Sequence, residues 1–76
     1  MAAAHEGGER VELKVNGGWR ETPELPTVGA LLTHLGVTHQ AVGVLQNGQV
    51  VAREAFDREP LHDRDELEIV RFVGGG

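Results

Sequence analysis

The chain has 76 residues, of which twelve are acidic and seven are basic, so its formal net charge at neutral pH is −5. This length allows one domain with a small core. The chain contains no cysteine, which excludes disulfides, thiolate metal sites and a cysteine nucleophile. That composition fits a reducing compartment, and we expect a cytoplasmic protein. The acidic balance argues against nucleic-acid binding, which relies on Lys and Arg contacts to phosphate.

The ends of the chain differ in character from its middle. Residues 1–9 are small, polar and glycine-bearing, so we predict a disordered extension without the basic and apolar regions of a signal peptide. No apolar run is long enough to span a membrane. We predict an ordered domain over residues 10–73 and a flexible glycine tail at residues 74–76.

The first predicted elements are two strands joined by a tight turn. Residues 10–16 place apolar side chains at every second position, which is typical of a half-buried strand. Asn16 and Gly17 predict a type I′ hairpin turn, and residues 19–22 then return as a second strand.

A short amphipathic helix is predicted after a proline-bearing connector at residues 22–26. Its apolar residues recur at i, i+3, i+4 and i+7, which places them on one face. They are Val28, Leu31, Leu32 and Leu35. Thr27 is suited to the N-cap, and Gly36 stands where a C′ glycine ends a helix.

The second half of the chain predicts another hairpin and a final strand. Asn47 and Gly48 give the turn signal between strands at residues 42–46 and 49–52. One helical turn is expected at residues 53–56, with Phe56 closing the edge of the core. The remaining segments are an acidic, solvated loop at residues 57–65 and a strand at residues 66–73.

The order of these elements is ββαββ(α)β, which predicts an α+β fold. We expect a β-grasp roll, with a mixed sheet of four or five strands packed on one main helix. The last strand is expected to lie beside the first in parallel, since no hairpin turn joins them.

The glycines at 74–76 carry the candidate chemistry. Glycine has no Cβ, so a run of three is thin enough to thread a narrow channel. The Gly76 carboxylate is ionised at neutral pH. Such a carboxylate attacks the α-phosphorus of ATP only when an enzyme positions it and neutralises the phosphates. The alternative is a frayed terminus without function.

Three segments resemble the ThiS family, the sulfur carriers of thiamine biosynthesis within the ubiquitin-like β-grasp proteins. Residues 27–32 (TVGALL) resemble the family's Thr-Val-x-x-Leu-Leu, and residues 47–53 (NGQVVAR) resemble its Asn-Gly-x-x-Val-Pro-Arg, with Ala52 replacing proline. Residues 63–76 resemble its Asp-Gly-Asp, apolar strand and glycine tail. Arg64 replaces the glycine there, which requires a non-glycine residue to take the turn geometry.

The resemblance implies that this chain is a co-substrate and not an enzyme. An E1-like, ThiF-like adenylating enzyme would join AMP to Gly76 with MgATP, while the chain itself binds no cofactor or metal. A persulfide donor such as a cysteine desulfurase would then convert the adenylate to a thiocarboxylate. A ThiG-like thiazole synthase would accept the sulfur, with Gly74 and Gly75 threading the partner's active site. We expect a monomer in isolation.

Docking is predicted beside the tail. Val70 and Phe72 lie on the opposite side of the strand from Leu67 and Ile69. If the helix covers Leu67 and Ile69, then Val70 and Phe72 form an exposed partner contact; if Phe72 folds over the sheet edge, it is ordinary core. Arg71 is either a contact for an acidic partner residue or a solvated charge.

The other residue clusters predict no site. The histidines His5, His34, His39 and His62 are scattered, and we expect them at the surface. The acidic loop lacks the spacing of a calcium loop, and we find no catalytic residues. Two alternative functions remain: a carrier subunit for molybdopterin synthase, and a ubiquitin-like protein modifier or tRNA-thiolation carrier. The single lysine, Lys14, argues against a modifier that polymerises through its own lysines.

Overall fold

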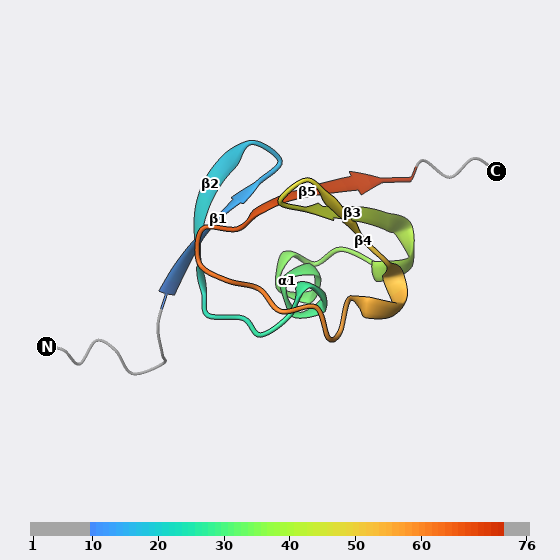
Figure 1. Ribbon diagram of the computed structural model, residues 1–76, viewed down its shortest axis with the longest axis horizontal. Helices are drawn as coiled ribbons and strands as arrows, with labels where there is room; N and C mark the ends of the chain where they lie inside the picture. The colour runs from blue at the N-terminus through green and yellow to red at the C-terminus, as the bar shows by residue number, and fades with distance from the viewer. Residues whose placement is uncertain (1–9, 73–76) are drawn as a thin grey trace, which may run out of the picture.

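The computed structural model describes residues 10–72, and its helix and strands follow the predicted order (Figure 1). The predictions for residues 1–9 and 73–76 lie outside the described residues and stay predictions. The elements are β1 (Arg10–Val15), β2 (Gly18–Pro23), α1 (Val28–Leu35), β3 (Val42–Gln46), β4 (Gln49–Val51) and β5 (Glu66–Arg71), with short 3₁₀ turns η2 (His39–Ala41) and η3 (Arg53–Ala55).

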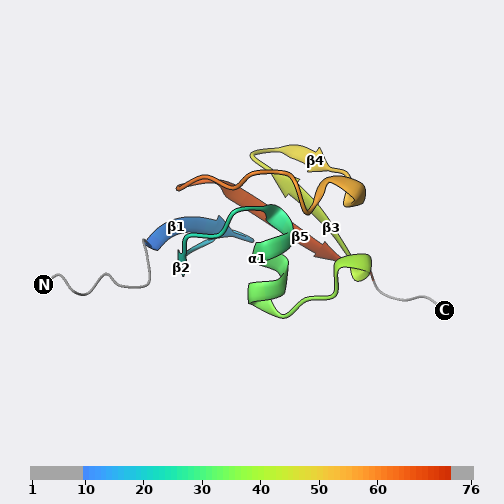
Figure 2. The ribbon, with the colours of Figure 1, turned by 90° about the horizontal axis from the view of Figure 1, so that it is seen from below.

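The five strands form one mixed sheet in the order β2-β1-β5-β3-β4. The last strand, β5, lies between β1, to which it is parallel, and β3, to which it is antiparallel. The predicted β-grasp arrangement and parallel pairing are therefore confirmed. Figures 1 and 2 show that α1 crosses one face of this sheet, while no other described element covers the opposite face.

Both caps of α1 are formed by the predicted residues. The Thr27 hydroxyl accepts a hydrogen bond from the Ala30 amide at 3.1 Å. At the other end Gly36 has φ of 77°, and the amides of Gly36 and Val37 donate to carbonyls of the last turn in a Schellman arrangement. The helix therefore stops where the glycine allows the left-handed conformation.

The core lies between α1 and the covered face of the sheet. Of the apolar helix residues, Val28, Leu31 and Leu32 are fully buried and Leu35 is only partly buried, while Phe56 is buried at one edge as predicted. The buried hydrophobic residues are Leu13, Val28, Leu31, Leu32, Val42, Val44, Val51, Phe56 and Leu67.

Some element boundaries differ from the prediction. Thr22 and Pro23 belong to β2 and not to the connector, and Thr22 is buried. Pro23 is tolerated because β2 is an edge strand, where one side of the backbone makes no ladder bonds. The strands β1, β4 and β5 are each shorter than predicted.

The two hairpin turns also hold β5. Asn16 and Asn47 both have φ of 52° and are each followed by a glycine at positive φ, as a type I′ turn requires. The Asn16 side-chain oxygen accepts from the Ile69 amide at 2.7 Å, and the Asn47 side-chain oxygen accepts from the Glu66 amide at 2.9 Å. Each turn thus fixes the register of the strand that leads to the tail.

Candidate docking surface beside the C-terminal tail

The predicted tail residues Gly74, Gly75 and Gly76 lie outside the described residues. What the structure describes is the strand directly before them. The last backbone contact of that strand runs from the Phe72 amide to the Ala41 carbonyl at 2.9 Å. The point from which the tail departs is therefore tied to the sheet.

Alternate residues of β5 face opposite sides of the sheet. Leu67 is buried against α1 and Ile69 packs on the same core, as predicted. Val70 and Phe72 face the other side and keep 46% and 55% of their surface exposed. Of the two interpretations of Phe72, the structure therefore supports the exposed one.

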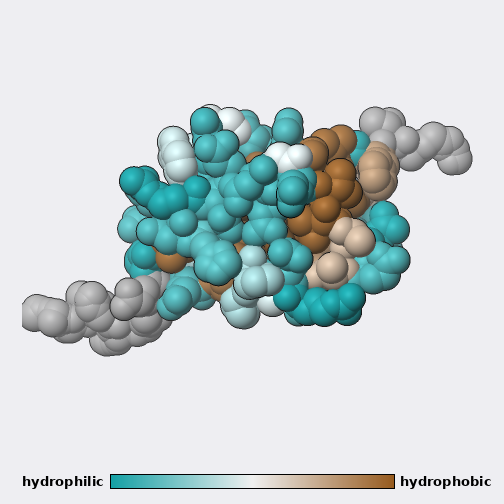
Figure 3. Space-filling view, viewed as in Figure 1, coloured by the Kyte–Doolittle hydropathy of each residue, from teal (hydrophilic) through white to brown (hydrophobic). Residues whose placement is uncertain are grey.

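These side chains belong to an apolar surface at the C-terminal end of the sheet, here called the tail-side patch and defined as Leu45, Val50, Val70 and Phe72. Val50 is 79% exposed and stands opposite Leu45 in the β3–β4 hairpin. The Phe72 ring lies across Gly43, where an added Cβ would be 3.3 Å from the ring. Figure 3 shows hydrophobic surface gathered at this end of the molecule, whereas the other end is mostly hydrophilic.

Arg71 does not join this patch. It shares the α1 side of β5 with Ile69, by the alternation of the strand. It lines one hollow with Arg20 and His34, and it meets Phe72 only at a smaller hollow where the strand ends. The predicted docking set of three residues is thus divided between two faces of the sheet.

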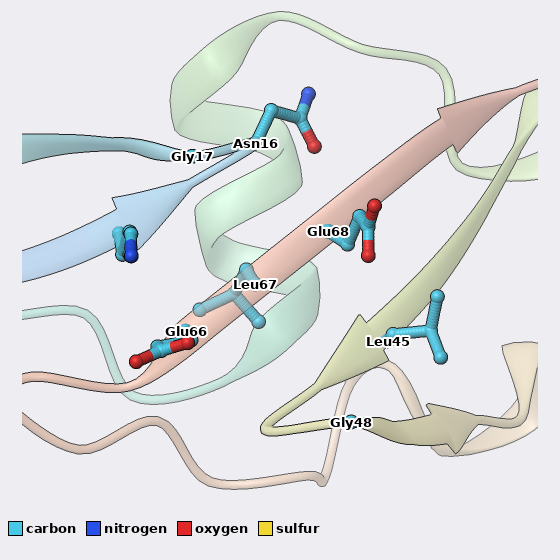
Figure 4. Close-up of a pocket in the computed structure, with 8 residues that line it drawn as sticks. Asn16, Gly17, Leu45, Gly48, Glu66, Leu67 and Glu68 are labelled. Atoms are coloured by element: carbon cyan, nitrogen blue, oxygen red, sulfur yellow. The ribbon is translucent and has the colours of Figure 1, made fainter.

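A second hollow, of about 350 Å³, lies on the uncovered face of the sheet, with α1 behind it (Figure 4). Figure 4 shows Leu45 and Glu68 on the same side of neighbouring strands. The lining residues are Lys14, Asn16, Gly17, Leu45, Gly48, Glu66, Leu67 and Glu68. This set has no nucleophile activated by a neighbouring base, so it adds a polar border to the tail-side patch and no chemistry of its own.

Asp65 contradicts the prediction of a solvated acidic loop. It is 8% exposed, and its carboxylate accepts hydrogen bonds from the Gln46 side chain, the Asn47 side chain and the His62 amide at 2.9–3.0 Å. Burial alone would raise the pKa of Asp65, but these hydrogen bonds and the nearby His62 outweigh it, so the pKa lies below its usual value. The carboxylate therefore ties the loop before β5 to the β3–β4 turn.

Sequence reasoning missed Asp65 because an aspartate within an acidic loop gives no local sign of burial. Two of its three donors, the side chains of Asn47 and Gln46, are 18 and 19 residues away in the sequence. The neighbouring Arg64 does take the positive φ expected of the family's glycine, at 75°. Its guanidinium pairs with Glu12 at 3.1 Å and lies over the Trp19 ring, so a side chain is accommodated in that turn.

The histidines do not form a site. His34 and His62 are exposed as predicted, whereas His39 is half-buried against the edge of the Phe56 ring and hydrogen-bonds the Thr33 hydroxyl. Among residues 10–72 no three His, Asp or Glu side chains are grouped so that they could hold a metal ion. Over the same residues, α1 is far too short to cross a membrane.

Comparison with known proteins identifies relatives over most of this chain. The model of the ThiS family matches residues 13–76. The sulfur carrier protein ThiS of Bacillus subtilis is 34% identical over 67 residues, which cover 84% of this chain and 98% of that protein. A crystal structure of the thiamine biosynthesis protein ThiS from Geobacter metallireducens superposes with a TM-score of 0.75 at 39% identity, covering 87% of this chain and 100% of that one.

Two further relatives are larger proteins. The thiazole synthases of Paramagnetospirillum magneticum and Magnetococcus marinus are 39% and 32% identical to this chain over 66 residues. The match covers 87% of this chain and only 20% of each synthase. A region similar to this chain therefore occurs within proteins that bear the synthase name.

Proposed function

Because this chain belongs to the ThiS family, we propose that it is a sulfur carrier for thiamine biosynthesis and that Gly76 bears the sulfur. The observation that carries the proposal is that the family match runs through residue 76 and so includes the three glycines. The names of the similar proteins, a sulfur carrier and two thiazole synthases, support thiazole formation over the molybdopterin and protein-modifier alternatives.

The proposed chemistry has two stages. A Gly76 carboxylate oxygen attacks the α-phosphorus of ATP in an adenylating partner, which releases pyrophosphate and leaves an acyl-adenylate. A persulfide sulfur then attacks the acyl carbon and AMP departs. A second thiol cleaves the resulting S–S bond, so the chain keeps a thiocarboxylate and the donor leaves as a disulfide. Partner groups must position and neutralise the reacting phosphates, and this chain supplies the acyl group.

Intact-mass spectrometry tests this chemistry directly. The 76-residue chain is incubated with MgATP, a ThiF-like adenylating enzyme and a persulfide donor, beside a variant lacking Gly76. We expect a mass gain that corresponds to exchange of one oxygen for one sulfur, found only in the chain that retains Gly76. The proposal is refuted if the chain gains neither AMP nor sulfur when the enzymes used are active on another carrier.

The tail-side patch is proposed to dock the partners. An exposed aromatic residue directly before the tail, with exposed Val50 and Val70 on the same face of the sheet, is the kind of surface that mediates protein association. Replacing Phe72 with serine is expected to raise the KM for the carrier about tenfold or more, as loss of an interface anchor does. The matched control is Trp19→Ser, which removes an aromatic residue of 49% exposure from an edge strand on the far side of β1.

The control decides what the Phe72 result means. Equal effects of Phe72→Ser and Trp19→Ser on KM would show that the tail-side patch is not part of the docking surface. Such a result would not bear on the proposed thiocarboxylate chemistry. Circular dichroism of both variants checks that the fold is retained.

A further inference from the structure

The strand β5 has an unpaired backbone edge directly before the tail. On one side, β5 pairs with β3 along its whole length, and the pairs alternate between hydrogen-bonded and non-bonded. The Phe72 amide donates to the Ala41 carbonyl and the Asn47 amide donates to the Glu66 carbonyl. These two bonds mark the hydrogen-bonded positions of the ladder, so Arg71 lies at a non-bonded position. The amide and carbonyl of Arg71 therefore point away from β3.

The neighbour on the other side ends too early to meet them. The parallel pairing with β1 stops at the Val15–Leu67 position. One step later the Asn16 side chain takes the place of a strand and accepts from the Ile69 amide at 2.7 Å. Beyond it, within residues 10–72, no element pairs with Arg71 on this side of β5. An exposed strand edge of this kind is a template for a further strand.

The unpaired edge borders a hollow of about 340 Å³ between β2, β5 and the end of α1. Arg20 and His34 approach it from β2 and α1, and Arg71 from β5. We call it the basic notch. Its lining is Val15, Asn16, Arg20, His34, Leu35, Val37, Ile69 and Arg71, which includes no Asp or Glu among the described residues.

The arginines of the basic notch have no ion-pair partner among residues 10–72. The arginine ion pairs of the described residues use Arg10 and Arg64, not Arg20 or Arg71. The helix end does not require these cations either, because Gly36 and Val37 already donate to its last carbonyls. Two unpaired arginines thus gather at one point of a chain whose net charge is −5.

We propose that the basic notch receives an extended acidic segment of the protein that takes up the tail. The segment adds as a strand to the free edge of β5 at Ile69–Arg71, and its carboxylates pair with Arg20 and Arg71. Backbone pairing would supply affinity and direction, while the charges would supply specificity. A partner strand running beside β5 would also guide the following glycines into the partner's active site. This inference rests on the proposed carrier function.

Charge reversal tests the electrostatic half, with the adenylating enzyme as the partner. Arg20→Glu and Arg71→Glu are each expected to raise the KM for the carrier about tenfold, with kcat unchanged, and Arg20→Lys is expected to retain most of the affinity. The matched control is Arg58→Glu. Arg58 is exposed and lies by the opposite end of α1, where the Glu59 carbonyl binds the first turn. Equal effects at all three arginines would overturn the proposal, since they would report net charge alone.

Hydrogen exchange tests the backbone half. The Arg71 amide is expected to exchange rapidly in the free chain and at least about tenfold more slowly in the complex, whereas the Phe72 amide is already protected by Ala41. An Arg71 amide that stays unprotected in the complex refutes strand addition. Protection that grows with the concentration of the chain alone identifies a second copy as the occupant, and refutes the proposal equally. If the wild-type chain forms no adenylate at all, the result refutes the proposed carrier function and not the proposed binding of an acidic segment at the basic notch.

Discussion

Replacing Asp65 with asparagine is expected to destabilise the fold strongly, although the two side chains have almost the same shape. The carboxylate accepts three hydrogen bonds, and an asparagine has only one acceptor oxygen. At least one donor is therefore left facing an NH₂ group. A hydrogen bond to a charged group contributes about 1.5–3 kcal/mol. We therefore expect a loss of about 2 kcal/mol in the free energy of unfolding at neutral pH, or roughly 8–16 °C in Tm for a domain of this size.

The effect should depend on pH in a defined direction. Because the pKa of Asp65 is lowered in the folded chain, its stabilisation is complete above the ordinary aspartate pKa of about 3.9 and is lost as pH falls through the folded value. The difference between wild type and Asp65→Asn should therefore be largest near neutrality and shrink below about pH 4.

Urea unfolding, followed by the fluorescence of the single tryptophan, Trp19, measures this difference at several pH values. Glu68→Gln is the matched control, since it removes one negative charge from an exposed side chain of β5. A loss in Asp65→Asn no greater than in the control, or a loss of the same size at pH values well below and above 4, would show that the buried carboxylate does not anchor this loop.

Substitutions at three further positions, Leu31, Asn16 and Gly29, test the scaffold by thermal or urea unfolding. Leu31→Ala removes a side chain with no exposed surface and should cost about 2–5 kcal/mol; a cost below this range would mean that the core relaxes around the cavity. Asn16→Gly removes the hydrogen bond to the Ile69 amide while keeping the turn, and should cost about 1 kcal/mol. Asn16→Ala should lose roughly 1–2 kcal/mol more, because alanine is strained at positive φ. Equal losses in the two variants would show that backbone strain does not contribute. Gly29→Ala should destabilise by about 1–3 kcal/mol, the reverse of the usual helical gain, because its Cβ would collide with the Asp57 carboxylate; a partial rescue by Asp57→Ala is expected.

Local patterns of the sequence determined most of the fold. The hairpin turns at Asn16 and Asn47, the Thr27 cap and the Gly36 stop each depend on the chemistry of adjacent residues, so they can be recognised from short segments. The alternation of β5 likewise predicted which side chains share a face of the strand, but it left Phe72 open between exposure and core, and the structure shows it exposed.

Only the tertiary structure decided which residues meet across the sheet. The burial of Asp65 and the contact of Asn16 with Ile69 join positions between 18 and 53 residues apart, which no local pattern records. The gathering of Arg20 and Arg71 at the unpaired edge of β5 depends on where β1 ends in space. A short-range pattern fixes the conformation of each segment, whereas contacts between segments follow from packing of the whole sheet on α1, and those contacts hold β5 and the surface beside its end.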